Sequence, residues 1–212
     1  HEIESYDSSS GRVVAWVNVP VLNNVTDTLL YMYYGNSNAD DQQNAAGVWD
    51  SNYLSVHHLE EKSGTSVLDS TGKNNGVANN VTLNAAGKID GANQFNGVNS
   101  RIILPQIFTT QNQFTIEAWI NTENKWGYVV SQRDWSNRGV FLQHYGGGSY
   151  SLYVNEKSLW RSSSINSWHY VVGTYDGATA KLYLDAGTPA TTPATLTWPS
   201  LQLIIGDRNT FN

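Results

Sequence analysis

The strongest constraint on this chain is a series of short segments in which hydrophobic and polar residues alternate at every second position. Alternation with a period of two places successive side chains on opposite faces of a β-strand. Residues 114–120 (FTIEAWI) show this clearly, because Phe114 and Ile120 fall on one face whereas Glu117 and Trp119 fall on the other. We expect the first face to lie in a core and the second to face solvent or a groove.

Similar segments recur along most of the chain and are separated by turn residues such as Asn96-Gly97 and Asp176-Gly177, which favour tight connections. The expected strands are residues 53–59, 91–95, 100–104, 114–120, 127–132, 139–145, 150–154, 168–175, 180–185 and 201–205. Many short strands without a convincing helix predict an all-β fold, an antiparallel β-sandwich of the jelly-roll type.

The N-terminal quarter has a different organisation. Residues 12–19 and 28–34 also alternate, and a turn at residues 20–27 would join them into a β-hairpin. Residues 37–47 are rich in Asn, Asp, Gln and Ala, which suits a linker or one short helix. We therefore expect a partial β domain with a β-hairpin over residues 1–50 and the sandwich over residues 53–212. Both ends interrupt strand-like sequence, so we expect the chain to be part of a longer polypeptide or assembly.

Composition narrows the range of partners. Charged residues make up 14% of the chain and the net charge is −6, whereas charged residues are roughly 25% of an average soluble domain. The basic residues are scattered singly, which argues against a nucleic-acid partner. Cysteine is absent, so disulfides and thiolate metal sites are excluded. The longest apolar run is much shorter than the roughly 20 residues that a membrane helix needs, so we expect no membrane span in this segment.

Catalytic signals are weak. Glycoside hydrolysis on such a sandwich needs two carboxylates roughly 5–9 Å apart, but the strand at residues 114–120 supplies only Glu117. No Gly-x-Ser-x-Gly motif is present. His57 and His58 are adjacent and would point to opposite faces of a strand, which is poor geometry for binding one metal ion. We expect a protein that is not an enzyme; catalysis would require a second carboxylate near Glu117.

Aromatic and polar residues concentrate between residues 124 and 145 and again at residue 160. Sugar-binding sandwiches use exposed aromatic rings to stack against pyranose C–H groups, with nearby polar groups taking the hydroxyls. The candidate ligand-binding residues are Trp126, Tyr128, Arg133, Asp134, Trp135, Tyr145 and Trp160. The alternative is that these side chains are ordinary core or rim packing.

From residue 53 onward, a succession of motifs resembles the LamG-like jelly roll of the concanavalin A-like lectin/glucanase superfamily. The motifs are VHHLE at 56–60, DSTGKNNG at 69–76, GKIDGANQFNG at 87–97, FTIEAWI at 114–120, WHYVVGTYDG at 168–177, KLYLD at 181–185 and IIG at 204–206. The family continues with a Gly-x-Ile-Asp-Glu strand that closes the sheet. The resemblance therefore implies that the last strand of the sandwich is missing here.

Residues 1–50 look like the C-terminal part of a small β domain of unknown function that precedes LamG-like domains in secreted and envelope proteins. This resemblance rests on HEIESYD at residues 1–7, AWVNVP at 15–20 and LYMYYGN at 30–36. It implies an extracellular or cell-envelope location and an adhesive or sugar-binding context.

The loop at residues 69–76 is a candidate calcium site. Asp69 and Asn75 offer the carboxylate and amide oxygens that Ca²⁺ prefers, and the loop matches one that can hold calcium in the LamG-like family. No other cofactor is expected. The alternative is that Asp69 and Asn75 cap turns by hydrogen bonding to their own backbone.

Together these features predict a non-catalytic extracellular adhesion or carbohydrate-binding module of a larger surface protein, with a glycan or a surface protein as its partner. The alternative is an architectural segment of an envelope or filament protein without a small-molecule ligand, including the extracytoplasmic part of an ExbB/TolQ-type proton-channel protein. Missing strands favour this alternative, because an incomplete sheet exposes an unpaired edge that another segment must cover.

Overall fold

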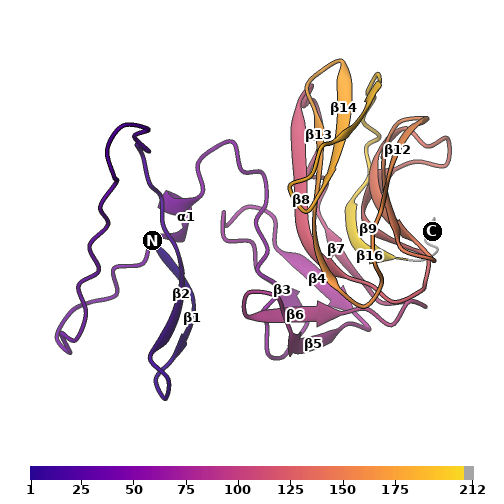
Figure 1. Cartoon of the computed structure of the whole chain (residues 1–212). Helices are drawn as coiled ribbons and strands as arrows, with labels where there is room; N and C mark the ends of the chain where they lie inside the picture. Colours follow the sequence, from indigo (N-terminus) through magenta and orange to yellow (C-terminus); the bar gives the residue numbers. More distant parts are fainter. Residues whose placement is uncertain (208–212) are drawn as a thin grey trace.

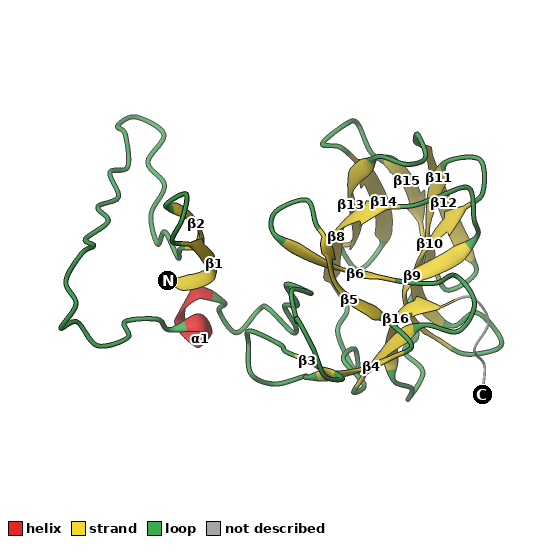
Figure 2. Cartoon of the chain, turned by 90° about the horizontal axis from the view of Figure 1, so that it is seen from below, coloured by secondary structure: helices red, strands yellow, loops and turns green. Residues whose placement is uncertain are grey.

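Two facing antiparallel sheets form most of the molecule in the computed structural model, which describes residues 1–207 (Figures 1 and 2). The larger sheet has eight strands. In order across the sheet they are β12 (Lys157–Ser162), β11 (Ser149–Val154), β10 (Gly139–Tyr145), β9 (Gly127–Arg133), β16 (Leu203–Asp207), β7 (Arg101–Leu104), β4 (Gly76–Asn79) and β3 (Ser66–Val67). The predicted antiparallel β-sandwich is thus confirmed, and residues 208–212 of the predicted jelly roll lie outside the described part.

The smaller sheet has four strands. They are β15 (Ala190–Pro193), β14 (Thr179–Leu184), β13 (Trp168–Tyr175) and β8 (Phe114–Asn121). A separate hairpin pairs β5 (Thr82–Ala86) with β6 (Gly91–Gln94). No helix in residues 1–207 is long and apolar enough to cross a membrane.

The core lies between the two sheets and follows from the alternation in sequence. Leu142 on β10, Leu152 on β11, Val171 on β13 and Leu182 on β14 are completely buried, because each strand turns every second side chain towards the other sheet. The sheets approach closely at Gly173, where an added Cβ would lie 2.9 Å from a methyl group of Leu152. A glycine on β13 therefore makes room for a leucine on β11.

Strand β8 confirms the face assignment made from sequence. Its apolar positions point inwards, with Phe114 and Ile120 buried, whereas Thr115, Glu117 and Trp119 are exposed. The outward positions of β8 are thus free for functions other than packing.

The N-terminal hairpin differs from the predicted one. Strand β2 (Arg12–Trp16) pairs with β1 (Glu2–Asp7) rather than with residues 28–34, so the prediction was wrong. A four-residue turn closes the observed hairpin, in which Gly11 at φ +71° donates its backbone N–H to the carbonyl of Asp7. A short connection costs less loop-closure entropy than a longer one, which favours this local pairing. Residues 28–34 instead lie in a long exposed loop that ends at α1 (Ala45–Val48), the expected short helix.

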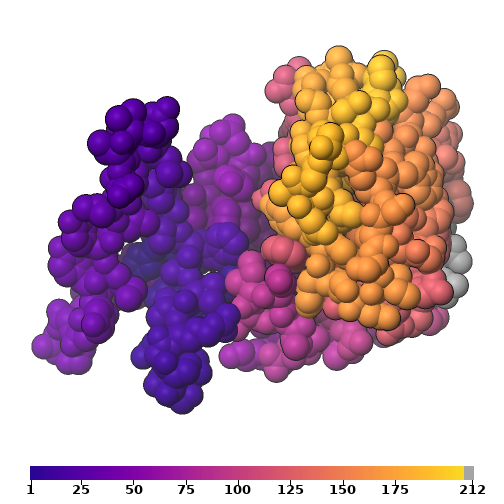
Figure 3. All heavy atoms as spheres, in the orientation of Figure 1, coloured from indigo at the N-terminus to yellow at the C-terminus, as the bar shows by residue number. Residues whose placement is uncertain are grey.

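Residues 53–59, expected to be a strand, belong to no strand among the described residues, and Leu59 has a left-handed backbone with φ +60°. They hold the N-terminal hairpin instead. The imidazole of His58 stacks on Trp16 at 5.4 Å, and its nitrogens lie 3.3 Å from the Glu2 carboxylate and 3.5 Å from the Glu4 carboxylate. The indole N–H of Trp16 also donates to Glu4 at 2.6 Å. This aromatic and polar contact joins the two parts of the chain. Figure 3 shows the N-terminal part, coloured indigo, lying against the following part of the chain.

The Leu152→Ala substitution tests the two-layer core. We expect it to lower the free energy of unfolding by about 2–5 kcal/mol, because it leaves a cavity between the sheets. The control Val25→Ala removes a side chain that is 85% exposed and should change stability by less than about 0.5 kcal/mol. Urea unfolding followed by tryptophan fluorescence measures both, and equal effects would contradict the core described here.

Candidate ligand-binding surface

The outer face of the eight-stranded sheet carries a row of aromatic rings. On β10, Val140 and Leu142 point into the core, so Phe141 and Tyr145 point away from it. Phe141 lies opposite Tyr153 of β11, and Ser151 of β11 lies opposite Trp160 of β12. Residues directly opposite each other share a face, and Ser151 and Tyr153, two positions apart on β11, also point to the same side. The rings of Phe141, Tyr153 and Trp160 therefore all lie on the outer face of the sheet.

The rings contact one another in a continuous series. Phe141 and Tyr153 stack with centroids 4.2 Å apart, Tyr145 and Trp160 lie 4.3 Å apart, and Tyr153 and Trp160 meet edge-on at 6.3 Å. The hydroxyls of Tyr145 and Tyr153 are 3.3 Å apart. Phe141 is buried beneath its neighbours, whereas Trp160 remains 42% exposed. We call Tyr128, Arg133, Phe141, Tyr145, Tyr153 and Trp160 the aromatic face.

Arg133 lies at one end of the aromatic face. Its guanidinium lies 4.7 Å from the Tyr128 ring centroid and 4.6 Å from that of Phe141, which is cation–π geometry. It also donates hydrogen bonds to the Tyr128 hydroxyl and to Asn137 Oδ1. Burial lowers the pKa of Arg133 and raises the pKa of Tyr128.

Tyr128 and Tyr153 of this face both have a raised pKa and stay neutral near pH 7. Burial, together with the hydrogen bond to Tyr145, raises the pKa of Tyr153 to about 12. Tyrosine hydroxyls both donate and accept hydrogen bonds, so Tyr145 and Tyr153, whose hydroxyls lie 3.3 Å apart, offer polar contacts beside the exposed ring of Trp160.

The structure brings together four of the predicted ligand residues, Tyr128, Arg133, Tyr145 and Trp160. Trp126 adjoins them, because its ring meets Tyr128 edge-on at 5.1 Å. Asp134 and Trp135 lie in the turn between β9 and β10 instead. The Asp134 carboxylate accepts hydrogen bonds from the backbone N–H groups of Ser136 and Arg138 and from the Arg138 guanidinium. It therefore stabilises that turn, while Trp135 is exposed on it.

Sequence reasoning missed Phe141 and Tyr153. Both belong to segments that were expected to be strands, and pairing residues 139–145 with 150–154 through the Gly146-Gly147-Gly148 turn would have placed the two rings opposite each other. The sequence therefore contains the information that places Phe141 beside Tyr153, but only through the pairing of two strands and not through a local motif.

The carboxylate of Asp69 is occupied by hydrogen-bond donors. The five donors are the backbone N–H groups of Val56, Thr71, Lys73 and Asn74 and the hydroxyl of Thr71, at 2.6–3.3 Å. Asn75 Oδ1 accepts the backbone N–H of Asp69 at 2.8 Å. A cation needs oxygen lone pairs directed at it, whereas here both side chains receive hydrogens. The arrangement fits the turn-capping alternative and does not fit a calcium ion.

The pKa of Asp69 reflects these contacts. Burial alone would raise it, but hydrogen bonds from Thr71, Val56 and Asn74 outweigh burial, and the pKa is lowered from its ordinary value of 3.8. Residues 1–207 contain no group of three or more His, Cys, Asp or Glu side chains that could hold a metal ion.

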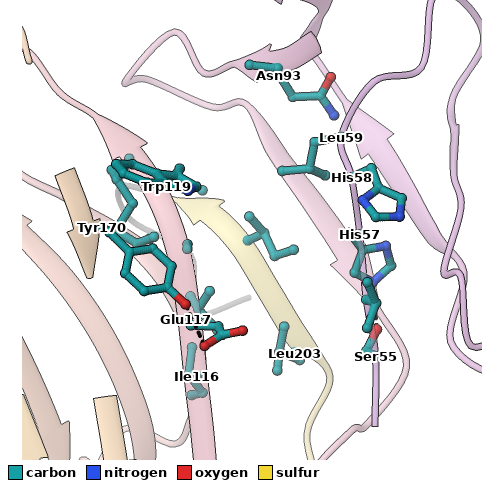
Figure 4. A pocket seen from close by; sticks show the side chains of 18 of the residues that line it. Ser55, His57, His58, Leu59, Asn93, Ile116, Glu117, Trp119, Tyr170 and Leu203 are labelled. Atoms are coloured by element: carbon teal, nitrogen blue, oxygen red, sulfur yellow. Dashed lines mark hydrogen bonds between the residues drawn. The ribbon is translucent and has the colours of Figure 1, made fainter. Parts of the chain in front are cut away.

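The other side chains considered for chemistry have separate partners. Tyr170 donates its hydroxyl to Glu117 Oε2 at 2.7 Å, so a phenol rather than a second carboxylate contacts this acid (Figure 4). His57 contacts Ser55 Oγ and the carbonyl of Leu68, whereas His58 lies between the glutamates of β1. His169 pairs with Asp185 at 2.7 Å.

Two facing antiparallel sheets around a shared core define the architecture as a β-sandwich. The chain belongs to the concanavalin A-like lectin/glucanase superfamily, which matches residues 95–212. Residues 1–74 match a domain of unknown function, DUF2341. Both matches agree with the resemblances seen in the sequence, whereas the proposed boundary between residues 50 and 53 stays a prediction. No curated protein matches the chain.

Solved structures share the fold at low sequence identity. Trypanosoma rangeli sialidase in complex with 2-keto-3-deoxy-D-glycero-D-galacto-2,3-difluoro-nononic acid is 17% identical with a TM-score of 0.53, over 73% of this chain and 27% of the sialidase chain. A mutant of that sialidase displaying trans-sialidase activity is 15% identical with a TM-score of 0.54, over 79% of this chain and 30% of the other. The chain thus spans less than a third of these proteins, and the likeness concerns the fold alone.

The Asp69→Asn substitution tests the turn cap. At pH 7 we expect it to lower the free energy of unfolding by about 1–3 kcal/mol, because buried donors lose a charged acceptor. The lowered pKa means that this contribution is present above pH 3.8 and is lost as pH falls through the folded-state pKa. The difference from wild type should therefore shrink on acidification. Urea unfolding between about pH 7 and pH 2 measures it, with the exposed Asp40→Asn as control; a difference independent of pH would refute the cap.

Chelation tests the ion directly. We expect EDTA to leave the thermal unfolding midpoint unchanged, because protein donors already occupy the Asp69 carboxylate. A bound ion would stabilise the folded state and raise the midpoint. A midpoint that falls with EDTA and recovers with added Ca²⁺ would show that calcium is bound.

Proposed function

We propose that this chain is a non-catalytic carbohydrate-binding or adhesion module of a larger extracellular or cell-envelope protein. The observation that carries the proposal is the half-exposed ring of Trp160, held by Tyr145 and Tyr153 on the outer face of a rigid sheet. Membership of the lectin/glucanase superfamily supports a glycan as the ligand, and the resemblance of residues 1–50 to domains of secreted proteins supports the location.

The binding mechanism follows from the geometry of the rings. Tyr145 lies 4.3 Å from Trp160 and limits the rotation of its indole, so little side-chain entropy is lost when a sugar ring stacks on it. The indole N–H donates to Ser158 Oγ at 3.3 Å, which also restrains the ring. The Tyr145 and Tyr153 hydroxyls beside it supply hydrogen bonds to sugar hydroxyl groups.

A binding role without catalysis agrees with the state of the acids. Asp134, the acid nearest in sequence to Arg133, forms an ion pair with Arg138 at the β9–β10 turn. Glu117 lies on the other sheet and is hydrogen-bonded to Tyr170. Asp134 and Glu117 thus have separate partners on different sheets, whereas hydrolysis would use two carboxylates close together.

The Trp160→Ala substitution tests the proposal. We expect wild-type protein to bind at least one carbohydrate on an array of neutral and acidic oligosaccharides, and the variant to bind it at least about tenfold more weakly because a stacking surface is lost. Titration calorimetry with the array hit measures the change.

The matched control is Trp119→Ala. Trp119 is 39% exposed, close to the 42% of Trp160, but it lies on the four-stranded sheet. The Trp119→Ala substitution should leave the affinity for the carbohydrate unchanged. The proposal fails if wild-type protein binds no glycan on the array, or if both variants weaken binding equally.

A further inference from the structure

Nine residues of β10, β11 and β12 point to the outer face of the eight-stranded sheet, and none of these nine is Asp, Glu, Lys, Arg or His. The cross-strand pairs and the alternation along each strand give the nine as Phe141, Gln143, Tyr145, Ser149, Ser151, Tyr153, Ser158, Trp160 and Ser162. Their polar atoms belong to hydroxyl groups, one amide and one indole N–H, all of which form hydrogen bonds. The surface around Trp160 is therefore built from aromatic rings and hydrogen-bonding groups, without an ionic partner from these nine positions.

Three basic residues border this surface in the sequence, and none of them faces its exposed ring. Lys157 and Arg161 of β12 each lie two positions from Leu159, which is buried in the core, so these two cations point away from the outer face. The Arg161 guanidinium donates to the carbonyl of Thr188. Arg133 lies on β9, three strand spacings and thus roughly 14 Å from β12. A carboxylate or sulfate bound at the exposed ring of β12 would therefore meet none of these three cations.

The exposed part of this surface follows β12. Ser158, Trp160 and Ser162 are exposed, whereas Ser151, opposite Trp160 on β11, is completely buried. Residues two positions apart on a strand lie about 7 Å apart, so one serine lies on each side of the indole. Ser158 Oγ also accepts the indole N–H at 3.3 Å. We call Ser158, Trp160 and Ser162 the β12 strip, which presents a flat ring between two hydroxyl groups.

The β12 strip matches the shape of a hexopyranose whose hydroxyl groups are equatorial. The axial C–H groups of such a sugar form a flat apolar face that stacks on an indole, whereas its hydroxyls project from the rim of the ring, towards Ser158 and Ser162. A carboxylate or sulfate at the same rim would lose water without gaining a cation, which costs free energy. The net charge of −6 further disfavours an anionic ligand.

We propose that the β12 strip binds neutral sugars of the β-linked glucose type, with one sugar ring stacked on Trp160 and its hydroxyls hydrogen-bonded to Ser158 and Ser162. The inference rests on the proposed function, because it names the class of carbohydrate bound at the same site. Carboxylated and sulfated sugars bind more weakly, since the strip contributes no charge to pair with them. Stacking and hydrogen bonding between uncharged groups are little affected by salt, whereas attraction between exposed charges is screened.

The experiment compares two matched tetrasaccharides by titration calorimetry with the full chain. One is a β-1,4-linked tetramer of glucose and the other a β-1,4-linked tetramer of glucuronic acid, which differ only in the CH₂OH or carboxylate substituent of each sugar ring. We expect the glucose tetramer to bind at least about tenfold more tightly, because the carboxylates gain no cation at the β12 strip. Raising NaCl from about 50 to about 500 mM should change its affinity less than about twofold, because screening acts on charges.

The Ser162→Ala substitution tests the hydroxyl beside the ring. We expect it to weaken binding of the glucose tetramer about twofold to tenfold, which is the worth of one hydrogen bond. The control Ser136→Ala changes an exposed serine in the turn between β9 and β10 and should leave the affinity unchanged. Both variants should keep the thermal unfolding midpoint of the wild type, because both serines are exposed.

The outcomes separate this inference from the proposed function. The inference is overturned if the glucuronic acid tetramer binds as tightly as the glucose tetramer, if neither tetramer binds, or if the affinity falls steeply with salt. Equal binding by wild type and Ser162→Ala also overturns it. In each of these cases a carbohydrate of any other class that binds through Trp160 would still support the proposed function. A chain that binds no carbohydrate at all overturns both.

Discussion

Burial of one face of each sheet against the other is the constraint on which the rest of the structure depends. Leu152 and Val171 are completely buried between the sheets, and the period of two commits every second residue of each strand to this layer. The remaining residues of the same strands point away from this core. On β12 the core takes Leu159 and leaves its neighbour Trp160 on the outside. The aromatic face is therefore the other half of the pattern that builds the core.

Exposed apolar patches promote association between protein molecules. The rings of the aromatic face instead pack against one another. Phe141 is covered by Tyr153 and by the Arg133 guanidinium, so that most of the apolar surface is already buried and only Trp160 projects substantially. A surface preorganised in this way pays little entropy on binding. The same arrangement explains why the sequence alone could not separate packing from the proposed binding, since Tyr145 and Tyr153 contact neighbouring rings and also carry hydroxyl groups.

The alternation in sequence was enough to predict the sandwich, including the inward and outward faces of β8, but not every pairing. Strand β12 (KSLWRS) has a polar majority and was not expected, so the register that sets Trp160 opposite Ser151 could not be foreseen. In the N-terminal part, residues 28–34 have the stronger strand composition, yet residues 2–7 are nearer to 12–16 and pair with them. Short loop closure prevailed over composition. At Asp69 the sequence left a turn cap and a cation site open, and the five hydrogen-bond donors directed at its carboxylate favour the turn cap.

Residues 53–59 show how side-chain contacts can decide where a segment lies. Within residues 1–207 this segment pairs with no strand of either sheet. His58 stacks on Trp16, and its ring nitrogens lie 3.3 Å from the Glu2 carboxylate and 3.5 Å from the Glu4 carboxylate. The junction between the N-terminal hairpin and the rest of the chain therefore depends on aromatic and polar side-chain contacts rather than on backbone pairing.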